Sequence, residues 1–496
     1  MVSLVPAAEF DARFDAEVDV LVVGAGGCGL VAALAAQAAG AEVAVVEKLD
    51  RFAGNTVLSS GSIPAAGTRL QRAAGIADDP DRFAADLRRV AGRHDADHMV
   101  DRLAGISAEL VHFLLDRVGV DLTLITHYRH VGHSVCRLHA PPSRRGADLI
   151  RDLERATEAR DIPVAFGNPA VALIVDGGAV CGAVTKADGG DTARIGAAAT
   201  VLACSGFGNS RALLDRFCPD MAAIPHFGAT GSEGDAVVWG EALGARLGNM
   251  ASFQAHAGVA QPHGALVTWT IVEKGGVVVD DAGARFADES QGYSAFAEHA
   301  ARHQRPTFAI YDRRIRDLTA AGQPEFGELV DHGGAREAAT VADLARLVGC
   351  PEARLAAVLA SADAAARGEA ADPFGRTAWG LAPLVPPYVV TRIAPALFHT
   401  QGGVIVDTEA RVLRADGTPI AGLYAGGGAA CGISGRHGSL GYVSGNGLLS
   451  ALGLGFIAGR AAARRAAAAK GKPATGRSPT ATLSPASNAS PHREGI

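Results

Sequence analysis

The order of apolar and polar positions in residues 18–50 predicts a strand, a glycine-rich turn, a helix and a second strand. The first strand reads VDVLVV, the turn GAGGCG, the helix LVAALAAQAAG and the second strand AEVAVVEK. Two strands joined by a helix within about 30 residues form a βαβ unit. The N-terminal part of the chain is therefore expected to belong to an α/β sheet.

Further along the chain, helical and strand patterns alternate. Helical patterns run around 80–118 and 146–160, and strand patterns cluster between 163 and 206, where Asp176-Gly177-Gly178 predicts a hairpin turn. From about 251 to 378, strands are followed by amphipathic helices such as 338–347 and 352–366. β-rich sequence returns at 387–407 and 420–427, and a glycine-rich helix is predicted at 445–466.

The turn of the first unit has the spacing of a dinucleotide-binding motif. Gly24, Gly26 and Gly29 satisfy GxGxxG directly after a strand and at the start of a helix. Gly24 permits the tight turn, Gly26 lets the backbone approach a pyrophosphate, and Gly29 allows close packing of helix on strand. Glu47, at the end of the second strand, is placed to accept hydrogen bonds from the adenosine ribose.

The loop that follows Glu47 favours FAD over NAD as the cofactor. Residues 51–67, RFAGNTVLSSGSIPAAG, are rich in hydroxyl groups and glycine and are suited to wrapping a flavin. Asn55, Thr56 and Ser60 are the expected flavin contacts within this loop. The cofactor is therefore expected to be FAD.

These patterns predict an α/β fold with a Rossmann-like FAD-binding domain and an inserted α+β cap domain. The FAD-binding domain is expected to comprise residues 1–250 and 379–466, and the cap, which would hold the substrate, residues 251–378. Residues 467–496 contain hardly any large apolar side chain and are rich in Ala, Ser, Thr, Pro and Arg. We expect them to form a disordered tail.

Composition narrows the class of partner. A formal charge of -6 and only five lysines disfavour nucleic-acid binding. The seven cysteines show no cluster or haem spacing, which indicates reduced thiols, a cytoplasmic location and no metal site. Electrons must then come from an external donor or go to an external acceptor. No apolar run is long enough for a membrane span.

Several short motifs outside the dinucleotide turn carry a family resemblance. They are Gly54-Asn55-Thr56 with Ser60-Gly61, Ala203-Cys204-Ser205-Gly206-Phe207-Gly208, Gly231 with Gly234-Asp235, Ala284-Arg285-Phe286 with Glu289, His399-Thr400-Gln401-Gly402-Gly403, and Gly422-Leu423-Tyr424-Ala425-Gly426. With these motifs, residues 17–466 resemble the fumarate reductase and succinate dehydrogenase flavoprotein superfamily. This superfamily also contains aspartate oxidases and 3-ketosteroid dehydrogenases.

The resemblance implies where FAD binds and that it is held without a covalent bond. Members with a covalent flavin use a His at the position of Asn55. Asn446-Gly447-Leu448 would begin a helix aimed at the flavin pyrimidine edge, where N-terminal amides stabilise negative charge on a reduced flavin. The complete set of expected cofactor-binding residues is Gly24, Gly26, Gly29, Glu47, Lys48, Gly54, Asn55, Thr56, Ser60, Gly61, Ala170, Val171, Ser205, Gly206, Asp235, His399, Gly426, Asn446, Gly447 and Leu448.

The residues that bind and protonate dicarboxylates in this superfamily are replaced here. Aligning the motifs puts Tyr293 at the proton-delivering Arg, Phe398 at the substrate-binding His and Tyr442 near the second Arg. Trp269 falls where those enzymes have a carboxylate on the proton path. His256 matches a substrate-facing His, with Ala257 in place of the usual neighbouring Pro.

Two tyrosines among aromatic residues suit a carbonyl-bearing, mostly apolar substrate better than fumarate. The arrangement resembles that of the 3-ketosteroid dehydrogenases. One Tyr would polarise the carbonyl and the other would exchange a proton at carbon, while flavin N5 exchanges hydride with the adjacent carbon. The expected catalytic residues are Tyr293, Tyr442 and His256.

The expected function is an FAD-dependent dehydrogenase or reductase acting on CH–CH groups. Alternatives are a fumarate reductase-like enzyme for an unsaturated carboxylate, an oxidase or hydroxylase that uses oxygen, and a flavin-binding protein without catalysis. Arg436, His437 and the His and Arg residues of segment 136–146 are further candidates for substrate contacts.

Overall fold

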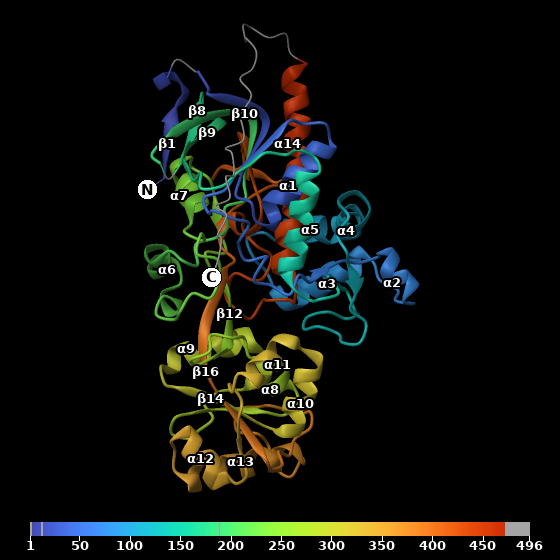
Figure 1. The fold of residues 1–496 in the computed structure, drawn as a ribbon, viewed down its shortest axis with the longest axis vertical. Helices are drawn as coiled ribbons and strands as arrows, with labels where there is room; N and C mark the ends of the chain where they lie inside the picture. Colours follow the sequence, from blue (N-terminus) through green and yellow to red (C-terminus); the bar gives the residue numbers. More distant parts are fainter. Residues whose placement is uncertain (1, 11–12, 188, 472–496) are drawn as a thin grey trace, which may run out of the picture.

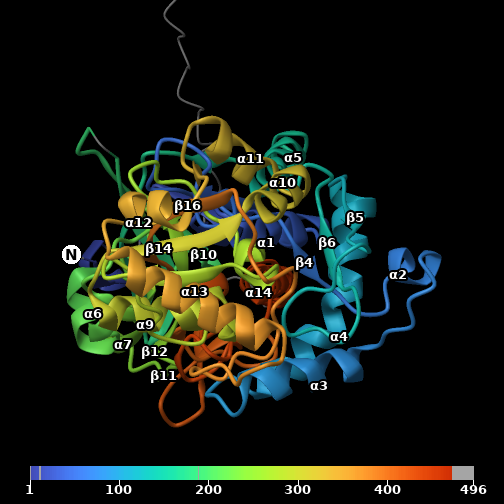
Figure 2. The ribbon, with the colours of Figure 1, turned by 90° about the horizontal axis from the view of Figure 1, so that it is seen from below.

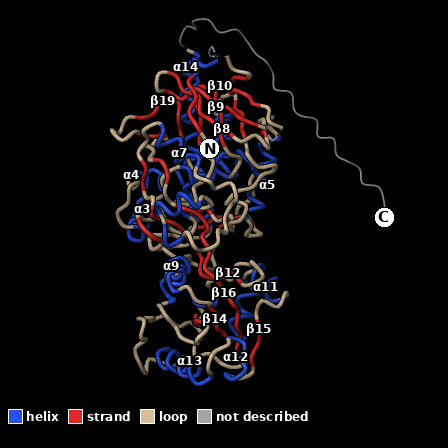
Figure 3. The backbone as a smooth tube through the Cα atoms, turned by 90° about the vertical axis from the view of Figure 1, so that its left-hand side faces the viewer, coloured by secondary structure: helices blue, strands red, loops and turns tan. Residues whose placement is uncertain are grey.

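Two lobes connected by long strands make up the molecule (Figure 1). The structure is a computed structural model that describes residues 2–10, 13–187 and 189–471. We call the lobe that contains both the N-terminal βαβ unit and the C-terminal helix the cofactor lobe, and the other the cap lobe. Two strands, β12 (Ala251–Ala260) and β16 (Tyr388–Thr400), lie at the waist between the lobes, as the tube in Figure 3 also shows.

A nine-stranded sheet forms the core of the cofactor lobe, in the order β1-β8-β9-β10-β2-β3-β7 with β19 and β18 attached through β10. The βαβ strands β2 and β3 are parallel, and β8, β9 and β10 form an antiparallel meander. Because β19 pairs in parallel with β10, the C-terminal part of the chain completes the sheet that the N-terminal part begins. The strands are β1 (Ser3–Pro6), β2 (Ala16–Val23), β3 (Val43–Val46), β7 (Val164–Ala165), β8 (Ala170–Asp176), β9 (Ala179–Lys186), β10 (Thr192–Leu202), β18 (Arg411–Leu413) and β19 (Pro419–Ala425).

Helix α1 (Gly27–Ala38) of the βαβ unit packs against the long C-terminal helix α14 (Asn446–Lys470). Glycines let the two backbones touch: a Cβ at Gly455 would lie 2.3 Å from the carbonyl oxygen of Cys28, and one at Gly459 would lie 2.2 Å from that of Ala32. From the Cys28–Gly455 contact to the Ala32–Gly459 contact, both helices move four residues toward their C-termini. Helices α1 and α14 therefore run parallel.

The remaining helices of this lobe surround the sheet and the cofactor loops. They are α2 (Arg69–Ala73), α3 (Pro80–Ala91), α4 (His98–Phe113), α5 (Gly146–Glu158), α6 (Arg211–Phe217) and α7 (Asp235–Ala242). Short strands β4 (Ile63–Pro64), β6 (Leu138–Ala140) and β5 (Thr123–Leu124) make a three-stranded sheet, and β11 (Leu247–Gly248) pairs with β17 (Gly403–Val404).

The cap lobe contains a six-stranded sheet in the order β13-β14-β16-β12-β20, with β15 paired to β16. Helices lie around this sheet when it is viewed from the cap end (Figure 2). The strands other than β12 and β16 are β13 (Val277–Asp280), β14 (Thr307–Asp312), β15 (Arg336–Ala338) and β20 (His437–Gly438). The helices are α8 (Thr270–Glu273), α9 (Tyr293–His303), α10 (Arg313–Gly322), α11 (Pro324–Asp331), α12 (Val341–Val348) and α13 (Glu352–Ala366).

The fold class expected from the sequence, a Rossmann-like α/β domain with an α+β cap, is confirmed. The hairpin at Asp176-Gly177-Gly178 joins β8 and β9 as expected. Two details differ. The helical pattern of 80–118 is divided because Gly92 takes a left-handed conformation at the end of α3. The last helix continues to Lys470, past the expected start of the tail at 467, because its run of alanines has high helix propensity.

The other expected domain boundaries stay predictions, and the expected tail beyond Gly471 lies outside the described residues. Across the described part of the chain, no helix has both the length and the apolar character to cross a membrane.

A buried ionic cluster fixes the start of α9 in the cap lobe. The Arg285 guanidinium binds both carboxylate oxygens of Glu289, at 2.8 and 2.7 Å, and also the carboxylate of Asp372. Glu289 also accepts a hydrogen bond from the backbone N–H of Val278. Since Glu289 begins the short 3₁₀ turn that leads into α9, this cluster determines where Tyr293 lies.

Replacing Arg285 with Ala should destabilise the protein by about 3–5 kcal/mol, because two buried carboxylates lose their counter-charge. The free energy of unfolding from urea titration measures this. Arg367→Ala is the matched control: its pair with Glu369 is 47% and 56% exposed and should contribute about 0–1 kcal/mol. Equal losses for the two variants would contradict the prediction.

Candidate functional site

The glycine turn before α1 has the geometry of a dinucleotide site. A Cβ at Gly24 would lie 2.5 Å from the Ala203 carbonyl oxygen, and one at Gly29 would lie 1.8 Å from the Gly24 carbonyl oxygen. These two glycines are therefore required by packing within the protein. At Gly26 the nearest atom to a Cβ, the Ala53 carbonyl oxygen, is 4.0 Å away. The free space beside Gly26 is where a pyrophosphate fits.

Two helix N-termini without side-chain caps border the site. Gly26 caps α1 and Gly445, in a left-handed conformation, caps α14; neither end receives a side-chain hydrogen bond from the described residues. The side-chain oxygen of Asn446, the first residue of α14, is buried without a partner. Free N–H groups and the helix dipole favour negative charge at both ends, so the residues present fit FAD.

Glu47 is held firmly at the end of β3. Its carboxylate accepts hydrogen bonds from the backbone N–H groups of Ala25 (2.7 Å) and Leu49 (2.9 Å). Each oxygen keeps a lone pair, so the carboxylate can still accept ribose hydroxyls. The backbone N–H of Asn168 donates to the Glu47 carbonyl, which brings the start of β8, with Ala170 and Val171, beside this acid.

Lys48 forms ion pairs with two acids. Its ammonium group lies 2.7 Å from Glu233 and 3.2 Å from Asp235, the first residue of α7. Burial lowers the pKa of Lys48, but the two carboxylates outweigh it and the net shift is upward. Lys48 and Asp235, both expected at the cofactor, are thus bound to each other.

The loop after Glu47 folds back onto the glycine turn. Gly54 has a left-handed conformation, and a Cβ there would lie 3.8 Å from the Cα of Gly26. The Asn55 side chain bridges two other segments: its oxygen accepts from the Ala229 backbone at 2.7 Å, and its amide donates to the Ser205 hydroxyl at 3.4 Å. Asn55 therefore links the loop to the strand end that carries Ser205.

Three more loop residues close the same side. Thr56 is buried, and its hydroxyl would lie 2.6 Å from a Cβ at Gly27, the first residue of α1. The Ser60 hydroxyl donates to the Ser62 hydroxyl at 2.9 Å, and the next residue, Gly61, has a positive φ of 68°. The expected flavin loop is thus packed directly against the first turn of α1.

The end of β10 meets the C-terminal segment. Ser205 has a φ of 67° and its hydroxyl lies 2.9 Å from that of Ser232. A Cβ at Gly206 would lie 2.4 Å from the Thr400 hydroxyl, and one at Gly426 would lie 2.7 Å from the sulfur of Cys28. Sequence motifs more than 190 residues apart therefore converge on one place.

His399 faces the start of α14. Its Nε2 would lie 3.3 Å from a Cβ at Gly447, and the Asn446 side chain donates to the Ser434 hydroxyl at 3.3 Å. Burial lowers the pKa of His399 to about 4, so the ring is neutral at pH 7. Leu448 is the third residue of the helix and is buried.

Tyr293 and Tyr442 come together from different lobes. Tyr293 begins α9 of the cap, and Tyr442 lies four residues before α14 begins. Their ring centroids are 6.2 Å apart with the rings edge-on, and each phenol affects the pKa of the other. Burial raises the pKa of both phenols, and for Tyr442 the hydrogen bonds from Tyr293 and from the Gly445 backbone partly offset this rise.

His256 of β12 stacks between two aromatic rings at this point. Its ring centroid is 4.6 Å from that of Tyr293 and 5.7 Å from that of Phe398, both at 18°. Its Nδ1 accepts a hydrogen bond from the Gly258 backbone at 2.9 Å, which leaves Nε2 to carry the proton. Burial lowers the pKa of His256 to about 3, so it is a neutral hydrogen-bond donor and not a proton-donating imidazolium.

Several residues near the tyrosines were not expected from the sequence. Phe227, 37% exposed, stacks on Phe398 at 5.6 Å. The Tyr128 hydroxyl, from the cofactor lobe, donates to Glu273 of the cap at 3.0 Å. These residues lie in loops or short helices without a motif, so the sequence carried no signal for them beyond their aromatic or acidic side chains.

Part of segment 136–146 is structural. Arg137 is fully buried and binds Asp78 at 2.7 Å and Asp86 at 2.8 Å, so it does not face a substrate. His139 is buried and lies 2.9 Å from the Thr68 hydroxyl.

The two candidates in the later loop are also accounted for. Arg436 lies 3.4 Å from Asp95, and His437 is an exposed residue of β20, which pairs with β12. Among the described residues, neither side chain forms a hydrogen bond with Tyr293, Tyr442 or His256.

This arrangement defines a flavin-binding α/β protein, and comparison with known proteins identifies the family. The model of the FAD binding domain family matches residues 19–445, and the chain belongs to that family. The expectation that FAD is the cofactor is thereby confirmed, as is the resemblance to the fumarate reductase and succinate dehydrogenase flavoproteins.

Curated relatives span two kinds of reaction. The chain is 31% identical to NADH:fumarate oxidoreductase of Klebsiella pneumoniae (90% of this chain, 48% of that protein) and 29% identical to urocanate reductase of Eggerthella lenta (83% and 69%). It is 24% identical to 3-oxosteroid 1-dehydrogenase of Mycobacterium tuberculosis (85% and 94%). The chain spans about half the length of the first of these.

Among solved structures, the open conformation of a flavocytochrome c3 fumarate reductase matches with a TM-score of 0.78 and 30% identity, over 92% of this chain and 79% of that one. Identity over the whole chain is thus higher to reductases than to steroid dehydrogenases.

A Gly26→Val variant should fold normally but lose most of its flavin. The backbone at Gly26 is extended (φ −77°, ψ −178°), which Val tolerates, and the new side chain would fill only the free space beside the turn. Flavin released by acid precipitation and circular dichroism measure the two effects. Gly29→Ala should instead misfold, because its Cβ overlaps the Gly24 carbonyl. Normal flavin content in Gly26→Val would mean that the cofactor binds elsewhere.

Proposed function

We propose that the protein is an FAD-dependent reductase or dehydrogenase that acts on a carbon–carbon bond next to a carbonyl group of a largely apolar substrate. The observation that carries this proposal is the edge-on pair of Tyr293 and Tyr442, which the two lobes bring together beside an aromatic wall that includes Phe398 and Phe227. When bound, FAD supplies the hydride chemistry at N5. The protein must supply a proton and hold the carbonyl.

The tyrosine pair suits proton exchange at one fixed position. The Tyr442 phenol lies beside Tyr293 and just before the start of α14, so its proton would be donated toward the substrate. Tyr293 would then return a proton to Tyr442 and regain its own from solvent after the product leaves. Burial keeps both phenols protonated at neutral pH, the form in which they donate.

His256 would orient the substrate carbonyl. Its Nε2–H is held in one tautomer by the Gly258 amide, and the ring is fixed by stacking on Tyr293 and Phe398. A neutral imidazole donates a hydrogen bond without transferring its proton. In this proposal His256 binds the carbonyl and the tyrosines move the proton.

The apolar wall disfavours the alternative, a fumarate reductase-like enzyme for small unsaturated carboxylates. Phe398, Phe227 and Trp269 stand around the site, and the Trp269 indole N–H is already bonded to the Glu289 carbonyl. A dicarboxylate would lose the charge-assisted hydrogen bonds of a guanidinium clamp. One argument supports this alternative: relatives of the chain include an NADH:fumarate oxidoreductase and a urocanate reductase, whose named substrates are unsaturated acids.

We further propose that FAD is bound non-covalently, since Asn55 uses its side chain to join Ala229 and Ser205 and has no nucleophilic nitrogen. Electrons would come from, or pass to, an external donor or acceptor. The cysteine pattern supports a cytoplasmic location.

The choice between the two substrate classes can be tested with reduced methyl viologen as the electron donor. We expect the holoenzyme to reduce the apolar enone benzalacetone and to leave fumarate unreduced. The reason is the aromatic wall formed by Phe398 and Phe227. Anaerobic assays of donor oxidation measure both rates. Fumarate turnover that exceeds enone turnover would support the unsaturated-carboxylate reductase instead.

Tyr442→Phe should lower turnover by about 10²-fold, because it removes a donor to charge that develops in the transition state. Flavin content and fold should not change, since the ring is retained. Tyr293→Phe should also slow turnover, and the double variant should lose less than the product of the two effects because both hydroxyls serve one step. Stopped-flow measurement of flavin oxidation gives these rates. Wild-type turnover in Tyr442→Phe would exclude the tyrosine mechanism.

A further inference from the structure

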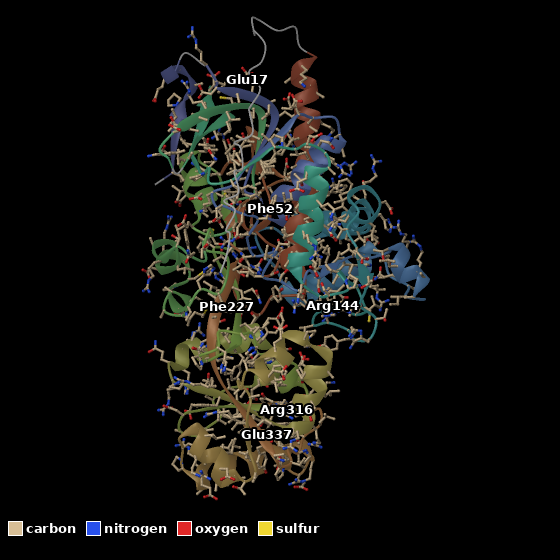
Figure 4. All side chains as sticks on the ribbon, viewed as in Figure 1. Glu17, Phe52, Arg144, Phe227, Arg316 and Glu337 are labelled. Carbon is tan, nitrogen blue, oxygen red and sulfur yellow. The ribbon has the colours of Figure 1, made fainter. Side chains whose placement is uncertain are left out.

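Arg144 lies in the cofactor lobe at the level where the two lobes meet, as its label in Figure 4 shows. It is partly buried, and among the described residues no acceptor or acid binds its guanidinium. Burial alone lowers the pKa of Arg144, with no carboxylate to offset it. The next residue, Arg145, differs because it is exposed and pairs with Glu328 of α11 at 3.0 Å.

The backbone of Arg144 is held in an unusual conformation. Its φ of 58° lies in the left-handed region, which side chains other than those of Gly, Asn and Asp rarely adopt. A turn fixes it, in which the Arg144 N–H donates to the Pro141 carbonyl at 2.9 Å. A non-glycine residue kept in such a conformation suggests a functional constraint on its side chain.

The turn is anchored on the flavin loop. The Gly146 N–H donates to the Ser59 carbonyl at 2.6 Å, and a Cβ at Gly61 would lie 2.9 Å from Pro141. Arg144 is therefore positioned by the same loop that is expected to wrap the flavin. The position is fixed before any ligand binds.

A segment that precedes Arg144 in the chain reaches the cap lobe. The Nδ1 of His130 in this segment is buried without a partner among the described residues. The His130 ring packs edge-on to Tyr128 at 4.9 Å, and Tyr128 donates to Glu273. This hydrogen bond joins the cofactor lobe to the cap, so the segment that precedes Arg144 lies where the two lobes meet.

We propose that Arg144 binds an anionic group on the substrate, remote from the carbon–carbon bond that reacts. The substrate class is then a carbonyl compound with an apolar body and a distal carboxylate. This inference rests on the proposed function for the identity of the reacting group, but not for the anion subsite itself. The subsite is separate from Tyr293, Tyr442 and Phe398, which stand in place of the charged residues of the dicarboxylate enzymes.

The anion subsite is tested by isothermal titration of the FAD-loaded protein with benzoate and with its neutral analogue benzamide. Wild-type protein should bind benzoate about tenfold or more tightly than benzamide, since a guanidinium–carboxylate hydrogen bond is charge-assisted. This preference should weaken as sodium chloride is raised. In Arg144→Gly, whose backbone suits the left-handed conformation, the preference should disappear while thermal stability is kept.

Two further variants make the test specific. Arg145→Gln removes the neighbouring charge and should keep the preference for benzoate, and Arg144→Lys should keep part of it. A wild-type protein that binds benzoate no better than benzamide, or an Arg144→Gly variant that keeps the preference, would overturn the proposal.

A second pair of probes separates this proposal from the proposed function. We expect the para-carboxylate of benzalacetone to have a KM about tenfold or more below that of its methyl ester, with similar kcat, and the difference to vanish in Arg144→Gly. If benzoate binding depends on Arg144 but neither enone is reduced, the anion subsite stands and the enone reaction fails. If both enones are reduced with equal KM and benzoate shows no preference, the reaction stands and the subsite fails.

Discussion

The parallel packing of α14 on α1 is the constraint on which the site depends. Gly455 and Gly459 bring the two helix backbones into contact, and this contact sets their relative height. Because Cys28 is the second residue of α1 and its neighbour Gly455 the tenth of α14, the two N-termini are offset by roughly 12 Å along the axis, at 1.5 Å per residue. A long cofactor with a phosphate near its middle and a ring at its end can meet both positive helix ends at once.

The parts of this arrangement that were predictable from the sequence are those with a local cause. Gly29 follows from the close contact of helix and strand within a single βαβ unit, where its Cβ would meet the Gly24 carbonyl, and the unit is short enough for its spacing to be diagnostic. Tyr442 was placed correctly relative to α14 because only four residues separate it from the first turn of that helix. In each case the geometry is determined by residues that are neighbours in the chain.

The parts that could not be predicted depend on partners far away in the sequence. Arg137 and Lys48 both seemed available for a ligand, yet Arg137 meets Asp78 and Asp86, and Lys48 meets two acids near the start of α7. Nothing in the local pattern distinguishes a guanidinium that is paired in the fold from one that is not. Arg144, a few residues beyond Arg137, carries the same guanidinium group, but among the described residues no acid pairs with it.

The division of the tyrosine pair between the lobes also has a consequence for timing. Tyr293 belongs to the cap and Tyr442 to the cofactor lobe. Strands β12 and β16 connect these lobes, and register shifts beside His256 interrupt their pairing. In the proposed mechanism, the two tyrosines would act together only while the lobes are in contact. A substrate that touches both lobes would then bring its own proton donors together, and proton transfer would follow substrate binding.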